Sequence, residues 1–306
     1  MSETQGFAPH RNHGCRLREY LWRGRACISL ENAFVRIVVC PGKGCDILEF
    51  THKLTDTEVL YQAPRGLSGS NERETSPLPG GPFRDQFAGG WFVMLPNGPQ
   101  PCEYRGAPFG QHGEVTHLAW DYSVIDDRPE RIEVHFRTRL RRMPVVMERR
   151  MVLTPESGTL TLTETVHNES GQALEVYWGH HPCFGEPFLT TDCEIILPSG
   201  GRLSLEDSAN DFSHISGFPE GRFTLRNPTR QVGFSLAWEA ALFPTLGLWR
   251  QWGGAVDYPA YGRRVLALEP AVDFPSLADS VARGTALTLA AGEARSTILE
   301  ASVFSL

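Results

Sequence analysis

Short runs of β-forming residues, separated by turn-forming residues, recur along the whole chain and restrict how its 306 residues can fold. Val, Ile, Leu, Thr and aromatic residues fill these runs, and 30 glycines and 22 prolines interrupt nearly every interval between them. Windows of ten or more residues show no sustained helical periodicity, which disfavours the helical and α/β classes. The expected strands are Ala26–Glu31, Val35–Cys40, Asp46–Thr51, Arg131–Arg139, Val145–Leu153, Thr159–His167, Ala173–Trp178, Cys193–Leu197, Val232–Ala237 and Ala286–Leu289.

Several of these runs alternate with a period of two. In Arg131–Arg139, charged residues at odd positions alternate with apolar residues at Ile132, Val134 and Phe136, as in an antiparallel strand with one wet face. Thr154–Gly158 reads as a hairpin connection. The sequence predicts an all-β fold, a large antiparallel β-sandwich with few short helices, as a single domain over residues 1–306. The polar segments Gly66–Pro82 and Pro198–Gly221 are predicted to be loops.

Charge and composition argue against several classes of partner. The formal net charge of -7 provides no basic surface for nucleic acid. No apolar run reaches the roughly 18 residues that a membrane span needs, and the first thirty residues lack an apolar signal core, so we expect no membrane partner and a cytoplasmic location. Seven cysteines without CxxC spacing predict free, mostly buried thiols rather than disulfides or a zinc knuckle.

Two titratable residues, His181 and Glu269, stand in apolar, strand-like runs, and each is followed by proline. A residue before proline is pushed toward extended backbone, and burying an ionisable group is costly unless a partner or a reaction needs it. Taken singly, a core histidine bonded to backbone and a carboxylate paired with Arg263 or Arg264 would explain them. Their joint presence indicates an acid–base pair.

His112 forms a third candidate, because glycines at 110 and 113 free the local backbone and leave the imidazole uncovered. The alternative is a turn histidine that faces solvent. A metal site made of His112, His181 and Glu269 would match a two-histidine, one-carboxylate inventory for iron or zinc, but no supporting spacing accompanies it. His180 and His181 face opposite sides of an extended strand and cannot share one ion.

Other catalytic motifs are missing from the sequence. The chain has no Gly-x-Ser-x-Gly nucleophile elbow and no phosphate-binding glycine loop. Cys183, two residues after His181, is the nearest candidate nucleophile, and we expect it to pack in the core. Acid–base chemistry without a metal or an organic cofactor is therefore the preferred hypothesis.

Three motifs follow one another along the chain: His112–Glu114 with Trp120 downstream, His181–Phe184 (His-Pro-Cys-Phe), and Leu268–Pro270 about ninety residues later. Together they resemble the aldose 1-epimerase (galactose mutarotase-like) family, in which a His-Pro-Tyr-Phe motif precedes a C-terminal Glu segment. Further likeness at Pro41–Pro64 and at Ala290–Glu293 extends the resemblance over nearly the whole chain.

The resemblance implies a galactose mutarotase-like supersandwich and an isomerase that interconverts the α and β anomers of a sugar. Glu269 would remove the proton of the anomeric hydroxyl while His181 protonates the ring oxygen. An unperturbed histidine pKa of about 6.5 leaves a protonated fraction near neutrality, and an ionised glutamate can accept a proton. The two groups should converge across a shared cleft about one pyranose wide. Sugar-binding roles are expected for His112, Arg84, Trp120 and Trp249.

Departures from the family pattern leave the substrate open. Cys183 stands where the family has an aromatic residue, and the Asn-Arg motif that binds sugar in the galactose enzymes has no clear counterpart here, which leaves Arg84 as the candidate for its role. The expected partner is a small-molecule sugar, which is neutral, deoxy, acidic, phosphorylated or sulfonated, and the expected state is a monomer or homodimer. Two alternatives remain: a non-catalytic carbohydrate-binding protein of the same fold, and a metal-dependent sugar isomerase or lyase that chelation would inactivate.

Overall fold

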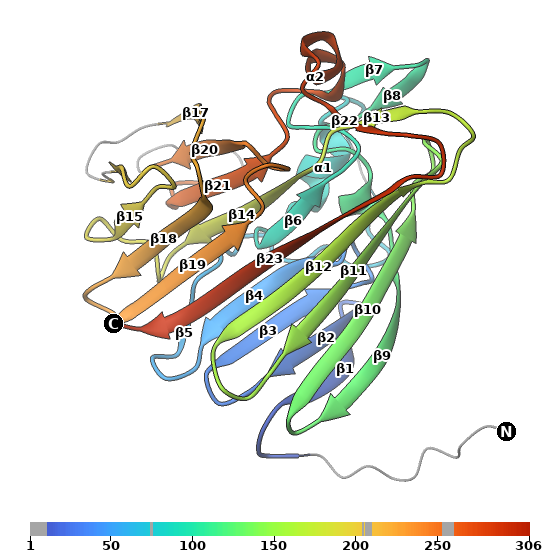
Figure 1. The fold of residues 1–306 in the computed structure, drawn as a ribbon. Helices are drawn as coiled ribbons and strands as arrows, with labels where there is room; N and C mark the ends of the chain where they lie inside the picture. Colours follow the sequence, from blue (N-terminus) through green and yellow to red (C-terminus); the bar gives the residue numbers. More distant parts are fainter. Residues whose placement is uncertain (1–10, 74–75, 204, 206–209, 253–259) are drawn as a thin grey trace, which may run out of the picture.

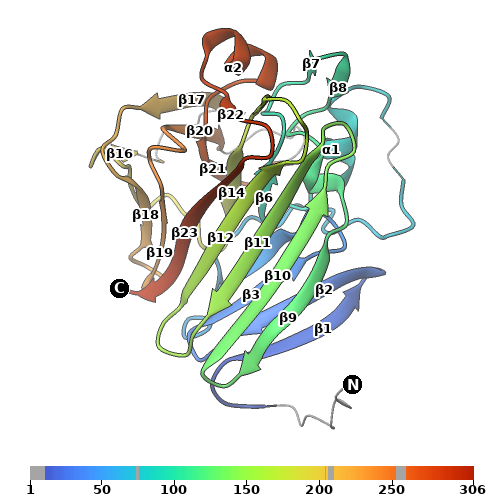
Figure 2. The same cartoon turned by 45° about the vertical axis from the view of Figure 1, so that its right-hand side comes forward.

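Two large antiparallel sheets pack face to face and make up most of the molecule (Figures 1 and 2). The computed structural model describes residues 11–73, 76–203, 205, 210–252 and 260–306. Within them, the first sheet has the order β1 (Arg16–Trp22), β2 (Arg25–Glu31), β3 (Val35–Cys40), β4 (Asp46–His52), β6 (Trp91–Met94), β14 (Gly179–Gly185), β21 (Val265–Ala271), β20 (Thr245–Gln251) and β17 (Asn210–Ser216), with β5 (Thr57–Glu58) beside β4.

The second sheet has the order β16 (Arg202–Leu203), β15 (Glu194–Ile196), β18 (Gly221–Asn227), β19 (Val232–Trp238), β23 (Ala294–Ser305), β12 (Thr159–Asn168), β11 (Val145–Leu153), β10 (Arg131–Arg139) and β9 (Asp121–Arg128). The smaller elements are α1 (Gly81–Gln86), β7 (Cys102–Tyr104), β8 (Ala107–Phe109), η1 (Val115–His117), β13 (Leu174–Val176), α2 (Leu277–Arg283) and β22 (Leu287–Leu289). Helix α2 and the β7–β8 hairpin lie together at one end of the sandwich (Figure 1).

The predicted all-β sandwich with few short helices is confirmed, and every expected strand run overlaps an observed strand. Residues 154–158 join β11 to β12 in antiparallel register, as expected of a hairpin. In β10 the period of two holds except at Glu133, which was predicted on the wet face but is buried. Hydrogen bonds from Arg150, Arg131 and His135 compensate the Glu133 carboxylate and hold its pKa far below the usual range.

Parts of the two predicted loops are regular structure. The segment from 198 to 221 contains β16 and β17, and β17 pairs with β20 along its whole length from Asn210 to Ser216. Strand β17 lies at the sheet edge and its side chains are mostly exposed, so it lacks the apolar alternation by which strands are recognised in a sequence. Helix α1 begins at the end of the segment from 66 to 82; residues 74–75, 204 and 206–209 lie outside the described part of these segments.

Alternate residues of β14 serve the two sides of the first sheet. Phe184 packs on Phe223 and Phe234 of the second sheet, and His180 contacts Glu164 there, so even-numbered residues face the core between the sheets. Odd-numbered residues face away from the second sheet, where His181 meets Phe92. His180 and His181 thus point in opposite directions, as their adjacency predicts.

All seven cysteines are free thiols; six are buried and Cys102 is half-buried, which confirms the prediction from their spacing. Among the described residues, no helix has both the length and the apolar character of a membrane span. The single domain over residues 1–306 stays a prediction.

Candidate active site

Strand register brings His181 and Glu269 together. Gly179 pairs with Ala271 and Cys183 pairs with Ala267, so His181 lies opposite Glu269 on the neighbouring strand and on the same face. Nε2 of the imidazole is 3.2 Å from Oε1 of the carboxyl group. The two groups are therefore in direct contact, closer than a separation of one pyranose width.

A cavity of about 360 Å³ opens over this pair. Its volume falls in the range of about 300 to 1,000 Å³ that small-molecule sites usually occupy. Loops after β6 and β8, the α1 segment and strands β14, β17, β20 and β21 all contribute to its wall. The lining residues are Phe83, Arg84, Phe87, Pro99, Gln100, Gln111, His112, His181, Phe212, Trp249, Gln251, Glu269 and Pro275.

Three of the four residues expected to bind sugar line this cavity: His112, Arg84 and Trp249. Trp120 does not. Its side chain is 4% exposed within the hydrophobic core, its Nε1 donates to the Val115 carbonyl at 3.4 Å, and the Arg149 guanidinium lies 5.5 Å from the ring centroid. Trp120 is thus a core residue, because the segment after η1 turns it inward.

Glutamines and the aromatic residues Phe83, Phe87 and Phe212 also line the cavity and were missed in the sequence. Gln251 ends β20 two residues after Trp249 and therefore shares its face, and Gln111 directly precedes His112. These adjacencies are the only sequence signals that could have found them. Phe212 belongs to the edge strand β17, and Gln100 to a loop, and neither carries a recognisable motif.

The backbone at His112 is held in an unusual conformation. Its φ is +62° and that of Gly113 is +78°, a left-handed geometry that costs a non-glycine residue on the order of 1–3 kcal/mol. The His112 N–H donates to the Gly98 carbonyl at 2.7 Å. The ring was expected to be uncovered, but it is only 3% exposed, because Phe83 and Phe92 pack edge-on against it at 4.4 and 5.2 Å.

A polar chain runs from the cavity edge to the imidazole of His112. Arg84 Nε donates to Gln111 Oε1 at 3.3 Å, and Gln111 Nε2 lies 3.4 Å from His112 Nε2. Because the amide nitrogen can only donate, His112 Nε2 is the acceptor in this contact and Nδ1 carries the ring proton. Burial, and then the neighbouring His181, His117 and Arg84, hold the pKa of His112 well below its usual value, so the ring is neutral.

Burial also sets the protonation of the central pair. It raises the pKa of Glu269 to about 8 and lowers the pKa of His181 to about 3, even though a hydrogen bond to the His181 backbone favours the charged imidazole. Between these values the pair holds one proton, on the carboxyl group, and both side chains are neutral. The unperturbed histidine pKa assumed from the sequence does not apply here, because water cannot solvate the buried imidazolium.

Three polar atoms of the lining have no hydrogen-bond partner among the residues that the structure describes: His112 Nδ1, Gln251 Oε1 and Glu269 Oε2. A buried polar group without a partner costs about 1–3 kcal/mol. The cost falls on three residues of one cavity. A hydroxyl-rich ligand has the donors and acceptors that these atoms lack.

Aromatic rings frame the rest of the site. Phe92 stacks on His181 with ring centroids 4.4 Å apart and an interplanar angle of 19°, which fixes the plane of the imidazole. Trp249 lies 6.0 Å from the same imidazole, and Phe212 is 44% exposed on the adjoining strand. Rings of this kind can stack against the apolar face of a sugar.

A family model described as a domain of unknown function (DUF4432) matches residues 22–220. The chain belongs to this family. No curated protein matches the sequence. Solved structures do resemble it: a candidate aldose 1-epimerase from Klebsiella pneumoniae has a TM-score of 0.77 at 13% identity, covering 95% of this chain and 88% of that one.

Galactose mutarotase-like structures show the same similarity. A protein so described from Lactobacillus casei has a TM-score of 0.64 at 14% identity and covers 91% of this chain and all of its own length. A galactose mutarotase related enzyme from Lactobacillus acidophilus has a TM-score of 0.62 at 16% identity, covering 94% and 98%. This DUF4432 chain therefore has the galactose mutarotase-like fold, as a divergent branch, which confirms the predicted resemblance.

Among the described residues of this DUF4432 protein, no group of three or more His, Cys, Asp and Glu side chains is arranged as a metal site. The other histidine of the motif, His180, belongs to a buried ionic network. Its Nε2 lies 3.2 Å from Glu164 Oε2, while Arg149 Nε donates to Glu164 Oε1 at 2.6 Å and Trp91 Nε1 donates to His180 Nδ1 at 3.3 Å. Burial opposes ionisation of Glu164, but Arg149 and His180 outweigh it and lower the Glu164 pKa to about 2.

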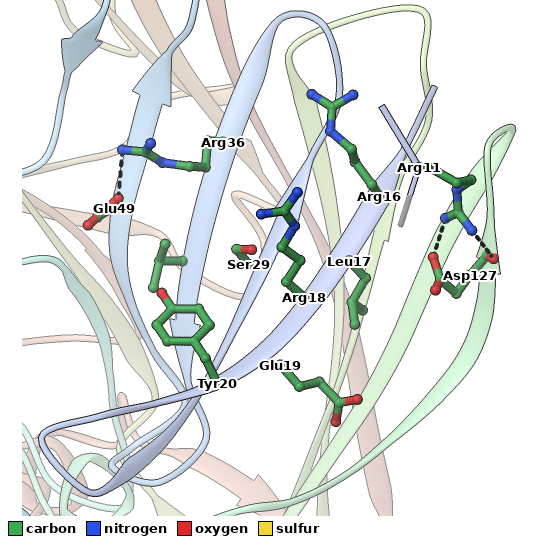
Figure 3. Close-up of a pocket in the computed structure, with 11 residues that line it drawn as sticks. Arg11, Arg16, Leu17, Arg18, Glu19, Tyr20, Ser29, Arg36, Glu49 and Asp127 are labelled. Carbon is green, nitrogen blue, oxygen red and sulfur yellow. Dashed lines mark hydrogen bonds and ion pairs between the residues drawn. The ribbon is translucent and has the colours of Figure 1, made fainter. Parts of the chain in front are cut away.

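A larger hollow of about 770 Å³ lies over strands β1 to β4 and is lined by other residues than the cavity over the pair (Figure 3). Arginines dominate its wall, and most of them have carboxylate partners: Arg11 with Asp127, Arg36 with Glu49, and Arg16 with Glu31. Among its described lining residues there is no histidine and no buried carboxyl group. We interpret it as a solvated, charged sheet face.

Proposed function

We propose that this chain is an aldose 1-epimerase that interconverts the α and β anomers of a sugar by acid–base ring opening. The observation that carries the proposal is the 3.2 Å contact between His181 Nε2 and Glu269 Oε1 within a cavity of small-molecule size. The shared fold with solved aldose 1-epimerase candidates supports it.

Mutarotation needs an acid and a base that are close together. The anomeric hydroxyl oxygen and the ring oxygen are bonded to the same carbon, and ring opening removes a proton from the first while adding one to the second. Two groups in contact with each other can reach both oxygens at once. A pair that holds a single proton supplies one donor and one acceptor.

The proton must first cross the pair. In the free cavity it resides on Glu269, because burial disfavours the charged forms of both groups. A substrate hydroxyl that donates to the unpartnered Oε2 of Glu269 stabilises the carboxylate, and the proton then moves from Oε1 to His181 Nε2. This step prepares Glu269 as the base and His181 as the acid.

Ring opening then follows. The carboxylate of Glu269 takes the anomeric proton, the imidazolium of His181 protonates the ring oxygen, and the bond between the anomeric carbon and the ring oxygen breaks to give the open-chain aldehyde. The pair returns to its neutral form. After rotation about the bond beside the aldehyde carbon, the same transfers in reverse close the ring on the other face.

The remaining lining residues bind the sugar in this proposal. Trp249 stacks on the apolar face of the ring, and His112 and Arg84 bond hydroxyls or an acidic substituent. The reaction needs no cofactor. The cytoplasmic location and the monomeric or homodimeric state remain predictions.

Anomeric exchange measured by NMR over a panel of sugars tests the proposal. For any sugar whose anomeric exchange the parent chain accelerates, Glu269→Gln and His181→Asn should each lower the exchange rate by about 100-fold or more, since general acid–base groups contribute roughly 10²–10⁴-fold. Glu148→Gln removes an exposed carboxylate on β11 and should leave the rate unchanged.

Two outcomes would contradict the proposal. If both variants catalyse exchange as fast as the parent chain, the two residues have other roles. If the parent chain binds a sugar without accelerating its exchange, and Glu269→Gln binds it equally well, the protein is a carbohydrate-binding module. Loss of activity on chelation would instead favour the metal-dependent alternative.

A further inference from the structure

Cys183 contacts the ring nitrogen of His181 that does not face Glu269. Its Sγ lies 3.1 Å from His181 Nδ1, two residues further along the same face of β14. The imidazole is therefore contacted at both nitrogens, by sulfur at Nδ1 and by the carboxyl group at Nε2. Phe92 stacks on the face of the imidazole and holds the ring in the plane that makes both contacts.

The thiol is not placed to act as a nucleophile. Cys183 is fully buried and does not line the cavity, so a substrate cannot reach its sulfur. Burial, followed by the charges of Glu269 and Asp46, raises its pKa well above the usual value, which keeps the sulfur protonated. Cys183 can therefore act on the reaction only through His181.

The direction of the hydrogen bonds follows from the available acceptors. The Cys183 S–H can donate to the His181 carbonyl, 3.9 Å from the sulfur, and a carbonyl can only accept. The sulfur lone pairs are then free to accept from Nδ1–H. On the other side, Nε2 lies 3.2 Å from Oε1 of Glu269, and burial raises the pKa of this carboxyl group to about 8, so that it keeps a proton it can donate.

We propose that Cys183 is a positioning residue that holds His181 in the Nδ1–H tautomer, leaving Nε2 free to exchange a proton with Glu269. Its catalytic consequence depends on the proposed mutarotase function. Sulfur is a weak, uncharged acceptor, so it orients the ring without trapping the proton as a carboxylate at Nδ1 would. Ala267, opposite Cys183 on β21, offers no side-chain group that could compete for the thiol.

Nitrogen NMR of the full chain labelled with ¹⁵N-histidine tests the tautomer directly. Two-bond ¹H–¹⁵N correlations distinguish a protonated ring nitrogen from an unprotonated one, and His181→Asn identifies the signal. We expect the parent chain to show a protonated Nδ1 and an unprotonated Nε2 near neutral pH. A protonated Nε2 in the parent chain would overturn the proposal, and this measurement needs no cysteine variant to fold.

Cysteine variants then test the residue itself. Cys183→Ala should mix the two tautomers and lower kcat for anomer exchange roughly tenfold, the loss that one hydrogen bond of about 1.4 kcal/mol would cause, with KM nearly unchanged. Cys183→Ser keeps a donor and an acceptor and should restore both readouts. Cys193→Ala, which removes a buried thiol near Phe188, should alter neither.

The outcomes separate this proposal from the function it depends on. An unchanged histidine spectrum in Cys183→Ala would refute the role of the thiol. If instead the spectra change as expected but no sugar is epimerised by the parent chain, the positioning contact stands and the proposed function fails.

Discussion

Replacing Glu269 by Gln should stabilise the protein relative to the parent chain, by an amount that grows as the pH rises. In the folded chain burial raises the Glu269 pKa from 4.5 to about 8. Between these values an unfolded chain has lost the proton that the folded chain keeps, so the unfolded state binds fewer protons and the free energy of unfolding falls with increasing pH. This loss of unfolding free energy is absent below about pH 4.5 and reaches its full size above about pH 8. Glutamine has nearly the same shape and cannot ionise, so it removes this effect.

The slope for one proton is about 1.4 kcal/mol per pH unit, and across the window it accumulates to several kcal/mol. Urea unfolding at a series of pH values from about 5 to about 8 measures it as the difference in unfolding free energy between variant and parent. A constant offset of about 1 kcal/mol for the altered contact with His181 would shift this curve without changing its slope. Glu148→Gln, on the exposed face of β11, should give a flat difference. A flat or falling difference for Glu269→Gln would refute the buried, neutral carboxyl group.

The remaining predictions concern pH, binding and stability. For anomer exchange, kcat/KM should decline above about pH 8, where Glu269 loses the proton that the pair needs. It should stay level as the pH falls to mildly acidic values, because the pKa of His181 is about 3. An inflection of kcat/KM near pH 6.5 would contradict this prediction. Trp249→Ala should raise KM several-fold, in line with an aromatic contact of about 1 kcal/mol, whereas Trp120→Ala should leave KM unchanged and lower the unfolding free energy by about 3–5 kcal/mol. Arg149→Met leaves Glu164 buried without its main partner and should cost about 3–5 kcal/mol in urea unfolding; a loss below about 1 kcal/mol would show that the pair is dispensable.

The sheets were predictable from the sequence where one face of a strand is buried. Alternation in β10 and β11 reflects direct contact with the core, so the pattern and the structure share one cause. Strand β17 was missed because its side chains are largely exposed and only its backbone bonds to β20 define it. A strand that is held only by backbone hydrogen bonds has no characteristic pattern of residue types, so the sequence does not reveal it.

The convergence of the two central residues of the candidate site could be predicted from the sequence, but their electrostatics could not. His181 and Glu269 stood out as ionisable groups in apolar strands, and the register that joins them follows once β14 and β21 pair. Their separation and their shifted pKa values depend on packing by residues far away in the sequence, such as Phe92, which no local pattern encodes. Trp120 was assigned to the sugar by its position in a motif, but the turn that follows η1 directs it into the core.

The two neighbouring histidines of β14 make the function of this strand depend on its register within the sheet. A displacement by one residue would exchange their imidazoles, so that His181 would face Glu164 in the interior and His180 would enter the cavity. The ion pair between Arg149 and Glu164, on the opposite sheet, therefore helps to fix which histidine faces the cavity. If the proposed function holds, replacing Arg149 on β11 or Glu164 on β12 should slow anomer exchange from a distance, by loosening the position of β14 rather than by altering a group that touches the sugar.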